Sequence, residues 1–104
     1  MLNPPPTDAE GYLMDPLDWS EEAAEDLAAA EGIMLGEEHW IVLRFMRIWL
    51  DEHRAAPDVR HVIKHLTQAT GAGRNRVLEL FPYGYVQQTC KIAGMRRPRA
   101  WSTG

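Results

Sequence analysis

The sequence LFPYGYVQQTCKIAGM occupies residues 80–95 and determines the architecture that we expect for the whole chain. Its proline and first glycine interrupt any helix that precedes them. Residues 86–92 can then form a short last helix that carries Cys90, the single cysteine of the sequence. Gly94 makes it unfavourable for that helix to continue. The stretch therefore predicts the end of a helical domain, followed by a flexible C-terminal arm over residues 95–104.

Four further helices are expected upstream of this stretch. The longest, about residues 37–55, has the sequence EEHWIVLRFMRIWLDEHRA, in which Trp40, Leu43, Arg47 and Leu50 share one stripe. Other apolar residues surround a second stripe, and such wide apolar coverage predicts a central, mostly buried helix. The remaining helices are expected at about residues 19–30, 58–69 and 75–81, with glycines and prolines marking their ends.

The N-terminal part of the chain carries weaker patterns. Residues 1–9 include three consecutive prolines and are expected to be an extended or disordered lead-in. Residues 10–15, EGYLMD, can form a short strand or hairpin. Asp18 is expected to cap the first helix, because Glu21 follows at the capping-box spacing. The sequence thus predicts a mainly α fold, a single domain over residues 10–94 with about five helices and a short N-terminal β-hairpin at most.

Composition limits the class of protein. The 104 residues are 45% hydrophobic and 25% charged, which is typical of one soluble domain. Arg44 and Arg47 interrupt the most apolar run, residues 40–50, so no transmembrane helix is expected. The N-terminus lacks the pattern of a signal peptide, and one cysteine cannot form an internal disulfide. We therefore expect a cytoplasmic protein that does not act at a membrane.

Charge is distributed unevenly along the chain. Residues 1–52 hold 13 acidic and 2 basic side chains, whereas residues 53–104 hold 2 acidic and 9 basic ones. Two interpretations stay open at this point. The two halves can attract each other across the fold, or the basic half can form a surface for an anionic partner.

Cys90 is the only soft nucleophile of the chain. A thiolate is the form of cysteine that attacks a persulfide or polysulfide and holds its outer sulfur. The positive charge of the adjacent Lys91 would favour that thiolate, and the arm cations Arg96, Arg97 and Arg99 would add to the effect if the arm folds back. The alternative interpretation is an inert, packed cysteine.

Two further clusters are candidate sites. His61 and His65 lie four residues apart on an expected helix, a spacing that suits zinc, but no third ligand accompanies them and no metal site is predicted. A helix, a Gly71-Ala72-Gly73 turn and another helix resemble a helix-turn-helix, and basic residues that could contact phosphates surround it: Arg60, Lys64, Arg74 and Arg76. The second helix of this pair is mostly apolar, which makes DNA binding the weaker hypothesis. No cofactor is expected.

Residues 80–95, read together with Glu38-His39-Trp40 and Gly11-Tyr12-Leu13, resemble the DsrC/TusE family of small sulfur-carrier proteins. The resemblance extends over about residues 11–95. It implies a small orthogonal helical bundle with a short N-terminal β-hairpin and a flexible C-terminal arm. It also implies a sulfur-relay protein of bacterial sulfur metabolism that acts as a carrier rather than as an autonomous enzyme. The implied partners are a sulfurtransferase or other sulfur-relay proteins, including a complex like sulfite reductase.

The arm departs from the family's pattern. Members of the family usually carry sulfur on a penultimate cysteine, and alignment on Cys90 places Trp101 at that position. The resemblance therefore implies that Cys90 can at most hold a persulfide or form a mixed disulfide with a partner. Lys91, Arg96, Arg97, Arg99 and Trp101 form the expected docking segment. The alternative is a non-catalytic regulator or adaptor that kept the fold and lost sulfur transfer.

Overall fold

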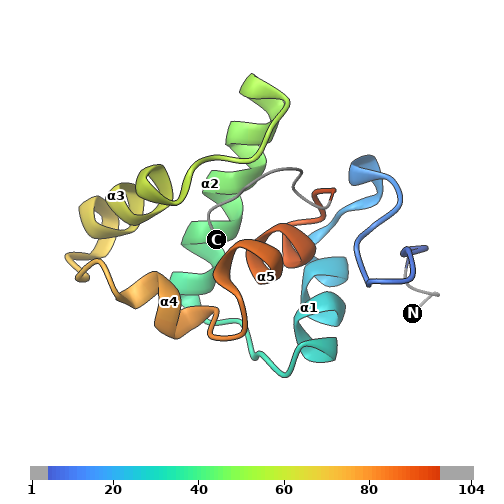
Figure 1. Cartoon of the computed structure of the whole chain (residues 1–104), viewed down its shortest axis with the longest axis horizontal. Coiled ribbons are helices and arrows are strands. Elements are labelled where there is room, and N and C mark those ends of the chain that lie inside the picture. Colours follow the sequence, from blue (N-terminus) through green and yellow to red (C-terminus); the bar gives the residue numbers. More distant parts are fainter. Residues whose placement is uncertain (1–4, 97–104) are drawn as a thin grey trace.

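The structure, a computed structural model, describes residues 5–96 of the chain. A 3₁₀ helix and five α-helices make up this part (Figure 1): η1 Pro16–Asp18, α1 Glu21–Ala30, α2 Glu37–His53, α3 Val59–Thr70, α4 Arg76–Leu80 and α5 Tyr85–Ile92. The five α-helices confirm the mainly α bundle predicted from the sequence. Each one begins and ends within about two residues of its expected bounds.

Helix α2 is the centre of the bundle. It packs against α3 along one side and against α5 on another, while α1 packs against α5 and α3 against α4. Figure 1 shows α1 and α5 side by side, with α3 and α4 on the other side of α2. The side chains of Val42, Leu43 and Met46 on α2 have no exposed surface. The wide apolar coverage of this helix therefore serves the core, as its sequence predicts.

The N-terminal hairpin is not formed. Residues 5–96 contain no strand, and only one isolated antiparallel bridge joins Thr7 to Leu13. Between these residues the chain makes a tight turn, in which Gly11 has a φ of +95°. The ladder cannot extend further, because Pro6 has no backbone donor and η1 begins at Pro16, right after the bridge.

The helix caps explain where the chain changes direction. Ser20, rather than the expected Asp18, caps α1: its hydroxyl accepts a hydrogen bond from the Ala23 amide at 3.0 Å. Asp18 instead ends η1, which the sequence pattern did not reveal. At the other end of the fold, Gly71 adopts the left-handed conformation and ends α3, as the glycine turn predicts.

Within residues 5–96, two ion pairs join the acidic half of the chain to its basic half. Arg76 contacts the carboxylate of Glu38, and the Lys91 ammonium lies 3.1 Å from Glu31. These pairs support the interpretation in which the two halves attract each other within the fold. None of the helices in the described part of the chain is long and apolar enough to cross a bilayer.

Candidate functional site

Cys90 lies in the core of the bundle. It occupies the last full turn of α5, and its side chain has no exposed surface. Burial raises the pKa of its thiol to about 12, and a hydrogen bond with Thr89 offsets only part of that increase. With such a pKa, about one thiol in 10⁵ is ionised at pH 7. In this conformation Cys90 is therefore protonated and inaccessible to a sulfur donor.

The polar neighbours of Cys90 in sequence do not expose it to solvent. Thr89 is fully buried, and its hydroxyl donates a hydrogen bond to the carbonyl oxygen of Tyr85 at 2.8 Å. Gln88 is also buried, and its amide donates to Glu31 at 3.1 Å. These side chains satisfy their hydrogen bonds inside the fold. Polar residues beside the cysteine in sequence therefore do not show that it is exposed.

Lys91 does not activate the neighbouring thiol. Its ammonium lies 3.1 Å from Glu31 and 5.2 Å from the centre of the Tyr12 ring. Hydrogen bonds from Gln88, and then from Lys91, keep the pKa of Glu31 below its usual range despite burial. This network joins the end of α1 to α5 and to the N-terminal turn. The structure thus gives Lys91 a structural role, and its charge is used in the pair with Glu31. The expected docking role of Lys91 stays a prediction.

The last turn of α5 is held by two side chains that the sequence analysis did not select. The Trp19 indole Nε1 donates to the carbonyl oxygen of Ile92 at 2.9 Å, and Arg47 Nη1 donates to that of Ala93 at 3.0 Å. The Arg47 guanidinium also stands 4.7 Å from the centre of the Trp19 ring. We call these two residues the C-terminal clamp. The sequence signal for Arg47 is its position as a charged residue on an otherwise apolar stripe of α2.

The described part of the arm ends just beyond this clamp. Met95 is buried, and Arg96 is exposed beside Asp8 and Met14 at a pocket of about 280 Å³. The other arm residues selected from the sequence lie outside the described residues: Arg97, Arg99 and Trp101. Their expected docking role stays a prediction.

The basic residues of the suggested DNA-binding face are only partly available. Arg76 contacts both Glu38 and Glu79, and Arg60 lies 3.2 Å from Asp58. Lys64 and Arg74 are exposed. Carboxylates thus already neutralise two of the four expected phosphate contacts, which weakens the electrostatic argument for nucleic acid at this face.

The histidines at zinc spacing stack on aromatic rings. His65 stacks on Phe45 with 4.4 Å between ring centres, and His61 lies 4.7 Å from the Trp49 ring. Between residues 5 and 96, no three His, Cys, Asp or Glu side chains come together in a way that could hold a metal ion. This pair therefore helps α3 to pack against α2.

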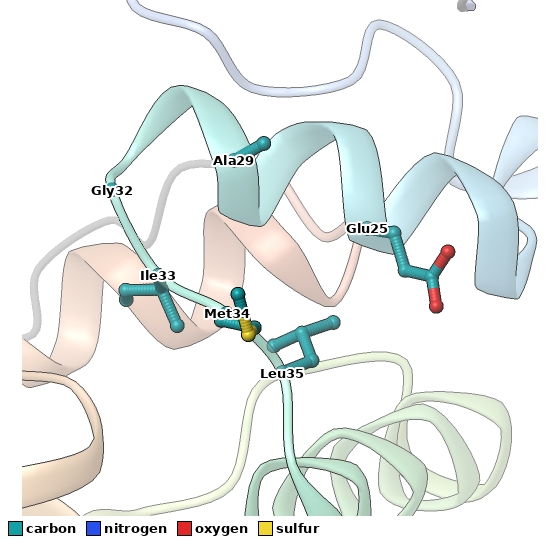
Figure 2. Close-up of a pocket in the computed structure, with 6 residues that line it drawn as sticks. All are labelled: Glu25, Ala29, Gly32, Ile33, Met34 and Leu35. Carbon is teal, nitrogen blue, oxygen red and sulfur yellow. The ribbon is translucent and has the colours of Figure 1, made fainter.

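A shallow, mostly apolar pocket of about 410 Å³ lies between α1 and the segment that connects α1 to α2 (Figure 2). Ile33, Met34 and Leu35, on the connection from α1 to α2, line it together with Ala29 and Glu25 of α1. Met34 is 90% exposed. Glu25 is the one ionisable side chain among the residues that line this pocket.

Comparison with known proteins places this fold. A family model described as "DsrC like protein" matches residues 3–100 of the chain. The sulfurtransferase TusE of Pectobacterium atrosepticum is 46% identical over 95 residues, which are 88% of this chain and 87% of the relative. The oxidized gamma-subunit of the dissimilatory sulfite reductase (DsrC) from Archaeoglobus fulgidus superposes with a TM-score of 0.83 at 32% identity, covering 91% of this chain and 90% of that one.

A second solved structure also has the same fold. A chain from the crystal structure of dissimilatory sulfite reductase I (DsrI) has a TM-score of 0.76 at 30% identity, with 91% of this chain and 88% of that chain covered. The fold is that of small sulfur-relay proteins. The chain belongs to the DsrC/TusE family, which confirms the resemblance found in its sequence. These comparisons do not favour the alternative of a regulator or adaptor.

Proposed function

We propose that this protein receives sulfane sulfur on Cys90 and passes it to a partner, after the last turn of α5 has moved to expose the thiol. The observation that carries the proposal is that the sequence contains one cysteine, in a chain of the DsrC/TusE family. Burial of Cys90 adds the requirement for an opening step. The protein would act as a carrier substrate rather than as an autonomous enzyme.

The proposed transfer is an exchange between a thiol and a persulfide. The Cys90 thiolate attacks the outer sulfur of a donor persulfide, R–S–SH, and forms a new S–S bond. The donor's S–S bond breaks, and the donor leaves as the thiolate R–S⁻. One sulfane sulfur changes carrier, the number of S–S bonds stays constant, and no external oxidant or reductant is needed. Release to an acceptor thiol follows the same steps in reverse.

The partners fit the same chemistry. A donor sulfurtransferase that carries a persulfide supplies the sulfur, and a thiol-bearing relay protein or a complex like sulfite reductase accepts it. The similarity to a chain of dissimilatory sulfite reductase I supports the acceptor that is like sulfite reductase. The segment from Arg96 to Trp101 is proposed to dock on these partners through its cations and its indole. We place the exchange in the cytoplasm, where thiols stay reduced.

Intact-protein mass spectrometry tests the proposal. Reduced protein is incubated with a persulfidated sulfurtransferase, and the matched control is Cys90→Ser. We expect one added sulfur atom on the native protein, none on the control, and loss of the added sulfur on reduction. Absence of the adduct under conditions that load a relative with a cysteine at the position of Trp101 would refute the proposal for that donor.

A further inference from the structure

The end of α5 is bonded to the rest of the fold by side chains rather than by backbone alone. The last carbonyl groups of a helix have no partner within the helix. Here the carbonyl of Ile92 accepts from Trp19, and that of Ala93 accepts from Arg47. A second nitrogen of Arg47 donates to the carbonyl of Pro16 at 3.1 Å. The C-terminal clamp therefore ties three segments together at the root of the arm.

The backbone after α5 fits closely beneath this clamp. Gly94 has a φ of +72°, and its amide and that of Met95 bond back to Lys91 and Cys90, at 3.2 and 2.9 Å. This is the usual geometry of a helix end with a left-handed glycine. A Cβ at Gly94 would lie 2.4 Å from the Trp19 ring, so the chain passes directly against the indole. Residues 92–95 cannot move outward unless the contacts with Trp19 and Arg47 break.

Cys90 lies directly behind this segment. Its carbonyl oxygen accepts the Met95 amide, and the side chains of both residues are buried. Trp19 and Arg47 are themselves partly exposed, so water or a bound partner can compete for their hydrogen bonds. The core contacts of Ile92, in contrast, are fully buried. Among the contacts that hold residues 92–95 in place, the hydrogen bonds of the C-terminal clamp are therefore the ones that water or a partner can replace without unfolding the core.

We propose that Trp19 and Arg47 are positioning residues that control access to Cys90: the thiol reacts when the clamp releases residues 92–95 in a local opening, while the rest of the bundle stays folded. A partner that binds at the root of the arm would promote this opening by replacing the clamp's hydrogen bonds. The inference gives the proposed sulfur relay its access step. It can be tested without a sulfur donor, so its failure and the failure of the relay are distinguishable.

Thiol labelling of the full chain with 5,5′-dithiobis(2-nitrobenzoate) tests the inference. Rates are measured for the native protein and for Arg47→Met, in the absence of urea and at several concentrations below the unfolding transition. The matched control is Arg44→Met, because Arg44 lies on the same helix, stands 5.3 Å from the Trp40 ring and pairs with the exposed Glu21. Cys90→Ser provides the blank.

We expect Arg47→Met to be labelled about tenfold faster than the native protein, since each lost hydrogen bond shifts an opening equilibrium by up to about that factor. The labelling rate of this variant should rise less steeply with urea than the rate of global unfolding does, because the local opening exposes only the buried side chains near residues 90–95. Arg44→Met should keep the native rate. Rates that are equal in all three proteins would overturn the inference. So would a faster rate in Arg47→Met that increases with urea as steeply as global unfolding does.

Trp19→Phe keeps the inference testable if Arg47→Met does not fold. Phenylalanine preserves a ring beneath the guanidinium but removes the donor to Ile92. The expected result is again faster labelling, with a urea dependence below that of global unfolding. The increase should be smaller than in Arg47→Met, because the bonds of Arg47 remain. A native labelling rate in a folded Trp19→Phe protein would count against the clamp.

Discussion

The His39 Nε2 atom lies 3.0 Å from the carbonyl oxygen of Leu80 and joins the start of α2 to the end of α4. The other ring nitrogen, Nδ1, accepts the Gly36 amide at 3.0 Å, so the neutral tautomer with the proton on Nε2 satisfies both bonds. The ring also makes an edge contact with Phe81, with 5.2 Å between centres. Glu38-His39-Trp40 and Leu80-Phe81-Pro82, two motifs of the family resemblance, thus meet at a structural contact.

This contact predicts a loss of stability at mildly acidic pH. Burial lowers the pKa of His39 below its ordinary value of 6.5, so the unfolded chain binds a proton more readily than the folded one. The contribution of His39 is complete above about pH 6.5 and decreases as the pH falls below it. Urea unfolding between pH 7.5 and 5.5 measures the effect.

His39→Gln should be less stable than the native protein at pH 7.5 and should lose less stability on acidification. Glutamine can donate to Leu80 but does not titrate. His53→Gln is the matched control, because His53 is an exposed histidine on the same helix. Equal pH slopes for the native protein and His39→Gln would show that His39 does not contribute in this way.

Glu31→Gln should lower the free energy of unfolding by about 1–3 kcal/mol, because Lys91 would keep its partly buried charge without a counter-ion. The amide oxygen of the new side chain can still accept from Gln88, so the substitution isolates the ion pair. Glu21→Gln is the control: it breaks an exposed pair with Arg44 and should change stability by less than about 1 kcal/mol. Chemical denaturation at pH 7 compares them, and equal losses would contradict the assignment.

Gly94→Ala should destabilise the protein by about 2–4 kcal/mol, because a Cβ there is strained at positive φ and overlaps the Trp19 ring. Gly71→Ala separates the two effects. Its φ is +79°, yet nothing lies within 4 Å of the added Cβ, so only the strain of about 1–2 kcal/mol is expected. Thermal unfolding of both variants gives the comparison. A Gly94→Ala protein as stable as Gly71→Ala would mean that Trp19 does not pack closely on the root of the arm.

Alkaline pH should destabilise the native protein more than Cys90→Ala. Burial raises the pKa of Cys90 from 9.0 to about 12, so the unfolded chain loses this proton first. The contribution of the buried thiol is complete below about pH 9 and is lost progressively as the pH rises towards 12. The free energies of unfolding of the two proteins, measured from pH 8 to 10.5, should therefore converge. A constant difference would indicate that the thiol is not buried in solution.

The helices could be predicted from sequence because their signals are local. The apolar stripes of α2 and the glycine after α3 are patterns among residues close together in the sequence. They therefore predict the ends of the helices to within about two residues. The prediction of Asp18 as the cap of α1 was wrong because Ser20, two residues further on, is also a residue type that caps helices. Asp18 is not available as the cap of α1 because it belongs to η1, which begins at Pro16. A helix of one turn is too short to produce a periodic sequence pattern.

The environment of Cys90 could not be predicted in the same way. Its burial depends on Trp19 and Arg47, which lie far away in the sequence and meet residues 92–94 only in the folded chain. Polar residues beside a cysteine are typical of an exposed segment, but here Thr89 bonds to the helix backbone and Gln88 to Glu31. Arg47, a charged residue on an otherwise apolar stripe, is the one local sign of such a polar partner.

The most direct test of the sulfur-relay account is the mass of the folded protein after exposure to a persulfidated sulfurtransferase, measured for the native chain and for Arg47→Met side by side. The account predicts one added sulfur on Cys90 in both proteins, acquired faster in the variant. The account would be contradicted if the folded native chain and the folded variant both stayed unmodified. The positive control is the native chain unfolded in urea, which inorganic polysulfide should modify on Cys90.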